Sequence, residues 1–177
     1  QIRSGDVIIG NTIQLRVIND TTAFGTYTDT PTITVREPAF VQNTFRGRND
    51  DGTETTATWK AIAGADWSQA VDTNFRVRFL IQTTTAGELV SQLQYNLNAA
   101  GWNNVNASSS VVRSSASPNV ADGLATTQQL GVGVFDADAF DEVDGNTVIN
   151  TIAAVTETES EFCVQIRSVD VVNNDTI

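Results

Sequence analysis

The stretch Phe75-Arg76-Val77-Arg78-Phe79-Leu80-Ile81 alternates with a period of two. Its odd-numbered positions are all apolar, and its even-numbered positions are Arg76, Arg78 and Leu80. Successive side chains of a β-strand point to opposite faces, so the pattern predicts a strand with one apolar face. We expect this strand to be central in a sheet, with its arginines facing solvent or acidic neighbours.

The same alternation continues along the chain in both directions. Thr12–Ile18 and Thr32–Arg36 repeat it, and Pro31 stands where strands commonly begin. Further strands are predicted over residues 40–48, 55–61, 92–98, 109–113 and 161–168. The segment 119–131 has room for one short helical turn. The 24 Thr favour strands and the 15 Asn favour turns, so we predict an all-β fold, a β-sandwich of jelly-roll or immunoglobulin-like type.

Composition excludes several classes of protein. The 177 residues carry 10 Lys and Arg against 21 Asp and Glu, with no His and one Cys. Lack of His excludes Ser-His-Asp catalysis and imidazole metal sites, and a lone Cys excludes disulfides within the chain. The acidic balance argues against nucleic-acid binding, and no apolar stretch is long enough to span a bilayer. We therefore expect a protein that is not an enzyme.

The two ends of the sequence repeat each other. Residues 1–13, QIRSGDVIIGNTI, align without gaps to residues 165–177, QIRSVDVVNNDTI, with 8 of 13 positions identical at an offset of 164. Chance does not easily produce such an identity. We therefore expect the sequence to start and stop at the same point of one repeating unit, with an N-terminal strand segment, 1–38, and a β-sandwich module, 39–177.

The repeat predicts how copies of the chain would join. In the first copy it leads into the strands at 12–18 and 32–36, whereas the second copy ends at Ile177, so we expect the last module to lack strands that complete it. Three arrangements remain open. The N-terminal strands fold back into their own module, complete the next subunit by donor-strand complementation, or belong to a longer covalent array.

In the last two arrangements the N-terminal strands are assembly strands. Their apolar residues, the predicted plugs into a neighbouring core, are Ile13, Leu15, Val17, Ile33 and Val35. The function predicted is that of a structural subunit or repeat of an extracellular filament or fibre, or of a virion appendage. Its partners would be copies of itself, at a cell surface or on a virion.

Three motifs resemble a family of tandem β-sandwich repeats in bacterial surface and phage virion-associated proteins. They are Arg48-Asn49-Asp50-Asp51-Gly52-Thr53-Glu54 followed by Trp59, Phe75-Arg76-Val77-Arg78-Phe79, and Leu93-Gln94-Tyr95. The resemblance covers roughly residues 40–177 and continues into 1–36 as the tail of a preceding copy. It implies a β-sandwich array of structural or adhesive character without known catalytic residues. Gly47 departs from the pattern, in which an aromatic residue is common there.

Acidic loops are candidate Ca²⁺ sites. The candidate ligands are Asp50, Asp51, Glu54, Asp136, Asp138, Asp141 and Asp144. Carboxylate oxygens are the ligands that Ca²⁺ prefers, although neither loop region has EF-hand spacing. Turn formation without a metal is the alternative, since Asp-Gly pairs such as Asp144-Gly145 favour turns. Paired carboxylates also serve glycosidases, but the sequence does not place two of these residues across a cleft.

Other side chains suggest glycan binding or modification. Trp67 and Trp102 offer aromatic faces on which sugar rings stack, which supports a second hypothesis, a carbohydrate-binding adhesion module of a surface or tail-fibre protein. Packing in the core is the alternative use of both tryptophans. Cys163 is either a buried free thiol or a bridge to another chain. The acceptor triplets N-x-[ST] for N-glycosylation begin at Asn19, Asn106 and Asn174.

Overall fold

A computed structural model of the chain describes residues 12–34 and 40–177. Contacts divide the chain into two compact units, Gln1–Pro38 and Ala39–Ile177, which we call the arm and the module. Regular structure in the described residues is almost entirely strand, and one short 3₁₀ helix, η1 (Leu97–Ala99), interrupts it. The predicted all-β fold class is confirmed.

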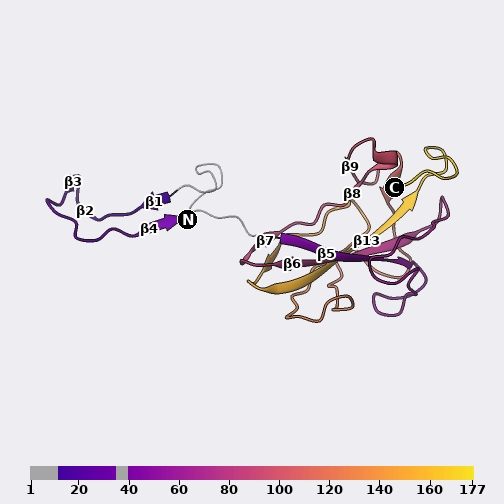
Figure 1. Cartoon of the computed structure of the whole chain (residues 1–177), viewed down its shortest axis with the longest axis horizontal. Helices are drawn as coiled ribbons and strands as arrows, with labels where there is room; N and C mark the ends of the chain where they lie inside the picture. The colour runs from indigo at the N-terminus through magenta and orange to yellow at the C-terminus, as the bar shows by residue number, and fades with distance from the viewer. Residues whose placement is uncertain (1–11, 35–39) are drawn as a thin grey trace. The chain divides into compact units, whose positions relative to one another are not determined.

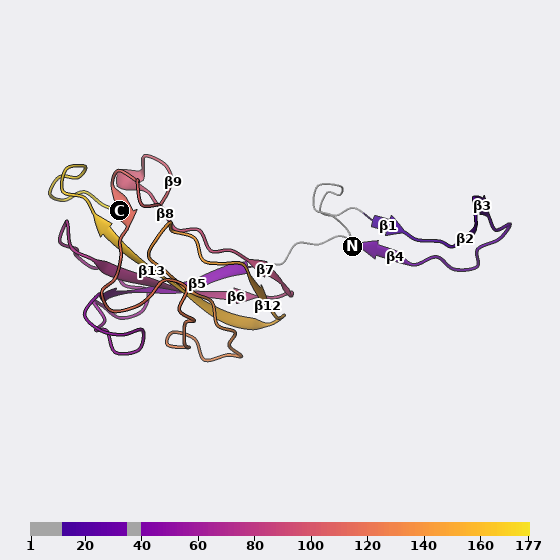
Figure 2. The ribbon, with the colours of Figure 1, turned by 180° about the vertical axis from the view of Figure 1, so that it is seen from behind.

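The module is built on one five-stranded sheet. Its strands in order are β10 (Val112–Ser114), β13 (Thr156–Ile166), β6 (Phe75–Thr83) and β5 (Phe40–Asn49), with β11 (Phe140–Asp141) also paired to β13. The β11 pair is parallel and the others are antiparallel. Figure 1 and Figure 2 show β5, β6 and β13 side by side. The strand predicted at 75–81 is therefore central, as expected.

Covering segments lie on both faces of this sheet. Two small antiparallel pairs accompany it, β7 (Gly87–Leu89) with β12 (Asn150–Ile152) and β8 (Gln94–Tyr95) with β9 (Asn103–Asn104). In both views β8 and β9 lie on one side of the sheet, and the loop between β10 and β11 lies on the other (Figures 1 and 2). This layering is consistent with a β-sandwich.

Several predicted elements differ from the structure. The strand expected at 55–61 is wrong, because this segment forms turns that are closed by hydrogen bonds from Thr58 to the Asp51 carboxylate. The strand expected at 92–98 shortens to β8, since η1 follows directly. The helical turn considered within 119–131 does not form, and Gly123 bends the chain there with a φ of 73°.

One face of the sheet is the main apolar core. Phe75 and Val77 of β6 pack there with alternate residues of β13 and with residues of the covering β8 and β9 side; the remaining buried members are Leu93, Tyr95, Val105, Val111, Val112, Phe162, Val164 and Ile166. Gly47 leaves room on this face for Trp67, whose ring lies 2.7 Å from where a Cβ of residue 47 would stand. Trp67 thus fills the space that a larger residue at position 47 would take.

The arm is a narrow antiparallel ribbon. β1 (Thr12–Gln14) pairs with β4 (Thr32–Thr34), which places Ile13 opposite Ile33, and β2 (Ile18–Asn19) pairs with β3 (Thr22–Ala23). The strand predicted over 12–18 therefore ends at Gln14. Leu15 and Val17 are 51% and 72% exposed. Within residues 12–34, the arm has strand pairing without a second layer to bury its apolar side chains.

Candidate functional site

The face of the module's sheet opposite the main core is also buried, and it is ionic. The strand register places Arg78 of β6 opposite Glu161 of β13, and Arg48 of β5 opposite Arg76 of β6. These four residues and Glu159 are all fully buried. The arginines predicted at the even positions of the central strand therefore meet acidic neighbours, and not solvent.

Arg78 is the centre of this ionic face. Its Nε donates to Glu161 Oε2 at 2.6 Å and its Nη1 to Glu159 Oε2 at 2.9 Å, while its Nη2 pairs with Glu54. Arg76 lies 3.3 Å from a carboxylate oxygen of Glu161, and the Arg48 guanidinium lies at the same distance from the other. Buried charges are tolerated when they are paired in this way.

The pKa shifts in the ionic face follow from burial and pairing. Burial by itself would lower the pKa of Arg78, but Glu161 and Glu54 outweigh it and raise that pKa above its ordinary value. Burial lowers the pKa of Arg48 despite the attraction of Glu161. Burial acts to raise the pKa of Glu54, yet its bonds with Arg78 and Thr127 leave that pKa below the ordinary value. Glu54 is therefore ionised at neutral pH.

A loop over residues 127–133 closes the ionic face. The backbone N–H groups of Gln129, Leu130 and Gly131 donate to Glu159 Oε1 at 2.9, 2.7 and 3.0 Å. Thr127 N–H donates to Glu54 Oε1 at 2.9 Å. These carboxylates thus hold a loop in place, which is a structural use of charge.

Two of the predicted Ca²⁺ ligands belong to this ionic face, and a third lies beside it. Asp50 lies 3.3 Å from the Arg76 guanidinium and Glu54 pairs with Arg78. Asp51 instead accepts hydrogen bonds from Thr58, and these hydrogen bonds lower the pKa of Asp51. The three side chains therefore meet protein donors.

The remaining predicted ligands lie in the loops around β11. The Asp138 carboxylate accepts from Ser160 and Ser91. Asp141 accepts from Gly145 N–H at 2.7 Å. Asp144 accepts from the N–H of Asn146 at 3.1 Å, and Asp136 is half-buried. The bonds of Asp141 and Asp144 are those of the turn alternative, whereas Ser160 and Ser91 are distant from Asp138 in the sequence. No group of three His, Cys, Asp or Glu side chains suited to a metal occurs in residues 12–34 and 40–177.

Asp141 is the most perturbed of these acids. Burial, followed by repulsion from Asp144, raises its pKa to about 6, although the N–H groups of Gly145 and Asp144 act in the opposite direction. Burial also raises the pKa of Asp138. Gly145 has a φ of 76°, and a Cβ there would lie 2.4 Å from Val105 O, so this turn requires glycine.

The three tryptophans have different surroundings. Trp67 packs against Phe45 and Phe75, with ring centroids 6.2 and 6.1 Å apart. Trp102 is 70% exposed. Trp59, the third tryptophan with an aromatic face on which a sugar could stack, lies under the guanidinium groups of Arg46 and Arg48 at 4.3 and 4.1 Å. Among the two glycan candidates, Trp102 has the accessible ring.

The cysteine and the glycosylation candidates also have definite places. Cys163 is a free thiol, fully buried with Val120 and Phe140, and burial raises its pKa. The bridging alternative for Cys163 is wrong, because the sulfur lies inside the module. Asn106 uses its side-chain oxygen to accept from the N–H and hydroxyl of Ser108, both at 2.8 Å. Asn174 is exposed, and Asn19 lies in β2.

The predicted assembly strands form the arm. Ile13 is half-buried, whereas Leu15, Val17 and Ile33 are exposed. Val35 lies outside the described residues. Exposed apolar groups on a two-stranded ribbon are the surface that a partner would cover.

The second copy of the repeat, residues 165–177, forms a tail fixed to the module. Ile166 is buried in the core, and Arg167 pairs with Asp170 at 3.4 Å. Thr176 N–H donates to Asn98 Oδ1 at 3.0 Å, and Asn98 N–H donates to Thr176 O at 2.9 Å. The four tail residues named here are identical in the first copy. Asn98 was missed by sequence reasoning because nothing local links it to the tail.

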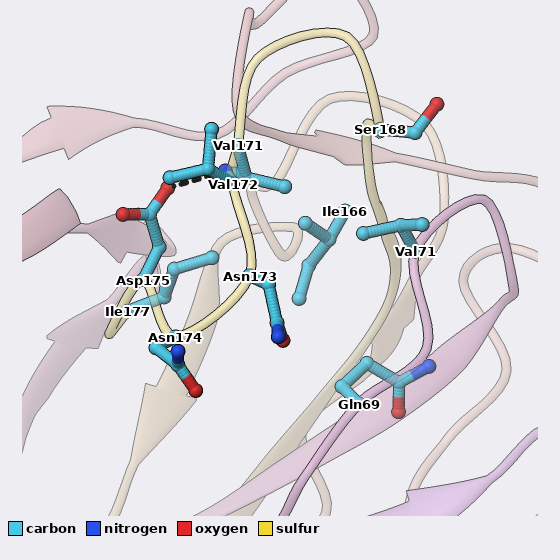
Figure 3. A pocket seen from close by; sticks show the side chains of 10 residues that line it. All are labelled: Gln69, Val71, Ile166, Ser168, Val171, Val172, Asn173, Asn174, Asp175 and Ile177. Carbon is cyan, nitrogen blue, oxygen red and sulfur yellow. Dashed lines mark hydrogen bonds between the residues drawn. The ribbon is translucent and has the colours of Figure 1, made fainter.

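A hollow of about 380 Å³ lies between this tail and the turn before β6 (Figure 3). Polar and apolar side chains line it in equal number, and the apolar ones are Val71, Ile166, Val171, Val172 and Ile177. In the close-up, Ile166 and Val71 lie across the hollow from Ile177. The tail therefore carries a second partly uncovered apolar surface.

No protein-family model, curated protein or solved structure matches the chain at a significant level of similarity. Within the residues that the structure describes, no helix is long and apolar enough to cross a membrane. The resemblance to tandem surface repeats stays a prediction that rests on the three sequence motifs.

Proposed function

We propose that the chain is a structural module that associates with copies of itself in an extracellular filament, fibre or virion appendage. The observation that carries the proposal is the arm, a strand ribbon whose apolar residues Leu15, Val17 and Ile33 are exposed, whereas the module buries a core of its own. Covering water-exposed apolar strands with a partner lowers the free energy and so favours association.

The terminal repeat supports the same proposal. Residues 1–13 repeat residues that the folded tail uses. They include the matches of Arg167 and Asp170, which pair within the tail, and of Thr176, whose N–H donates to Asn98 of the module. Such a repeat suits head-to-tail assembly, either by strand complementation or as a covalent tandem array. Both routes place the function in the joining of copies.

Sedimentation velocity over a range of concentrations, with electron microscopy of the largest species, tests this proposal. We expect the full-length chain to form oligomers that grow with concentration. Leu15→Asp should weaken this association at least about ten-fold by placing a charge on the arm. Val132→Asp is the matched control, because Val132 is 97% exposed on the module. A chain that stays monomeric throughout, or equal losses in both variants, would contradict the proposal.

A second candidate function, carbohydrate binding, has support at Trp102. Its indole is 70% exposed beside Asn104, whose side-chain oxygen accepts from Gln94 Nε2 at 2.7 Å. An aromatic face flanked by amides is suited to a sugar ring. Glycan-array binding that is lost in Trp102→Ala, retained in Trp102→Phe and unchanged in Ile62→Ala would support it. A flat array with intact self-association would count against it.

A further inference from the structure

We propose that the tail of one chain takes β4 of a second copy, in the place that β1 occupies within the arm. This inference rests on the proposed self-association and names the site and the strand that perform it. Its starting point is sequence identity, since Thr176 and Ile177 of the tail match Thr12 and Ile13 of β1.

The arm shows which edge of β1 is used for pairing. Ile13 lies opposite Ile33 of β4, and Leu15 N–H donates to Pro31 O at 3.3 Å. Backbone groups alternate in direction along an antiparallel strand, so Ile13, two residues before Leu15, also turns its N–H and C=O toward β4. Thr12 turns its backbone groups to the other edge.

The tail repeats this alternation on the surface of the module. Thr176, the match of Thr12, uses both of its backbone groups on one edge: its N–H donates to the Asn98 side-chain oxygen, and its C=O accepts from the Asn98 N–H. Ile177, the match of Ile13, makes no hydrogen bond with any residue in the described ranges. The unpaired edge of the tail is therefore the edge that β1 presents to β4.

The same position borders the hollow in Figure 3, on whose lining apolar and polar side chains mix. Ile177 lines it together with Val71 and Val172, and the three are 52%, 41% and 74% exposed. Directly opposite residues of paired strands place their side chains on the same face. Ile33 of the second copy, paired with Ile177, would therefore reproduce the pairing that β4 makes with β1 in the arm. Its side chain would cover the apolar residues that line the hollow.

Strand exchange of this kind has a low cost in the arm. Within the described residues, three residue pairs and the hydrogen bond from Leu15 N–H to Pro31 O join β1 to β4, and isolated two-stranded ribbons are marginally stable in water. The tail, in contrast, is already anchored by Asn98 and by the core contacts of Ile166 and Val171. A strand released from the arm meets a partner edge that is held in place.

Cysteine cross-linking between full-length chains tests this register. Thr12 lies opposite Thr34 in the arm, so Thr176 should lie opposite Thr34 of the second copy, at a separation that a disulfide spans. We would mix Thr34→Cys with Thr176→Cys under mild oxidation and measure the covalent heterodimer. The control mixes Thr34→Cys with Val169→Cys, since Val169 is 75% exposed on the tail but out of register. Native Cys163 is buried.

The expected result is a heterodimer yield at least about ten-fold higher for the Thr176 mixture than for the Val169 mixture. Equal yields, or no disulfide, in a chain that still oligomerises would overturn the strand exchange and leave self-association standing. A chain that shows neither oligomers nor the disulfide would overturn both. A chain carrying Thr12→Cys and Thr34→Cys together should close within one copy and suppress exchange, which provides a second readout.

Discussion

The module and the arm are both made of antiparallel strands, yet they bury their side chains very differently. In the module, both faces of the sheet are covered, and residues such as Phe162, Cys163 and Val164 are at most 2% exposed. In the arm, Val17 is 72% exposed although the same alternation predicts it on a buried face. Strand pairing thus supplies backbone hydrogen bonds, and only a second layer supplies the burial that stabilises a fold.

The two faces of the module's sheet differ as well. One is covered by apolar side chains, while the other holds three arginines against Asp50, Glu54, Glu159 and Glu161. The apolar face tolerates changes of shape at moderate cost, whereas the ionic face depends on every charge having its partner. We therefore expect the largest stability effects on the ionic face and the smallest in the arm.

The largest expected effect is that of Arg78→Leu. This change leaves Glu54, Glu159 and Glu161 buried without their shared cation, and breaking such a buried pair costs about 3–5 kcal/mol. Urea unfolding followed by tryptophan fluorescence measures it, because all three tryptophans lie in the module. Arg167→Leu, in a half-buried pair with Asp170, is the control and should cost no more than about 1 kcal/mol. Similar losses in both variants would contradict the importance of the ionic face.

A pair of glycine substitutions compares the two units directly. Gly47→Ala places a methyl group 2.7 Å from the Trp67 ring, and such overpacking costs about 1–3 kcal/mol. Gly25→Ala in the arm meets nothing within 4 Å, so module stability should change by less than about 0.5 kcal/mol. The same fluorescence-monitored unfolding distinguishes them. A Gly47→Ala variant as stable as Gly25→Ala would show that Trp67 is free to move aside.

Removing the charge of Asp141 should stabilise the module at neutral pH. Because the folded pKa of Asp141 is raised from 3.8 to about 6, the folded state binds its proton more tightly, and stability falls as pH rises through this interval. Asp141→Asn should therefore be more stable than the native chain at pH 7, by on the order of 1–2 kcal/mol, and this gain should shrink toward pH 4. Denaturation at several pH values checks this. Asp66→Asn, at an exposed position, should show no such trend.

The smallest expected effect on stability is in the arm. Val17→Asp changes an exposed side chain, so the urea midpoint of the module should move by less than about 0.5 kcal/mol in free energy. Self-association should fall nonetheless, since the arm surface is where copies are proposed to join. A large loss of module stability in Val17→Asp would mean that the arm forms part of the module's core.

Sequence reasoning reached the central strand because a period of two over Phe75–Ile81 has one structural meaning. For Arg76 and Arg78 it left solvent and acidic neighbours as alternatives, and the structure shows acidic neighbours. Sequence reasoning did not reach the partners themselves, because Glu159 and Glu161 lie about eighty residues away and are joined to Arg78 only by strand pairing. The strand predicted at 55–61 failed for a local reason, the capture of Thr58 by Asp51.

The sequence by itself determined the all-β class, the central strand and the repeat of residues 1–13 at 165–177. Alternation of side chains and identity of two segments can both be read from the order of the residues alone. The tertiary structure decided where the charges and apolar groups lie. It buried Cys163, assigned Trp67 to the core and left Trp102 outside, and it fixed the tail to Asn98. The physical reason is that burial and ion pairing depend on which segments, distant in the sequence, come into contact. In the sheet, strand register determines those contacts.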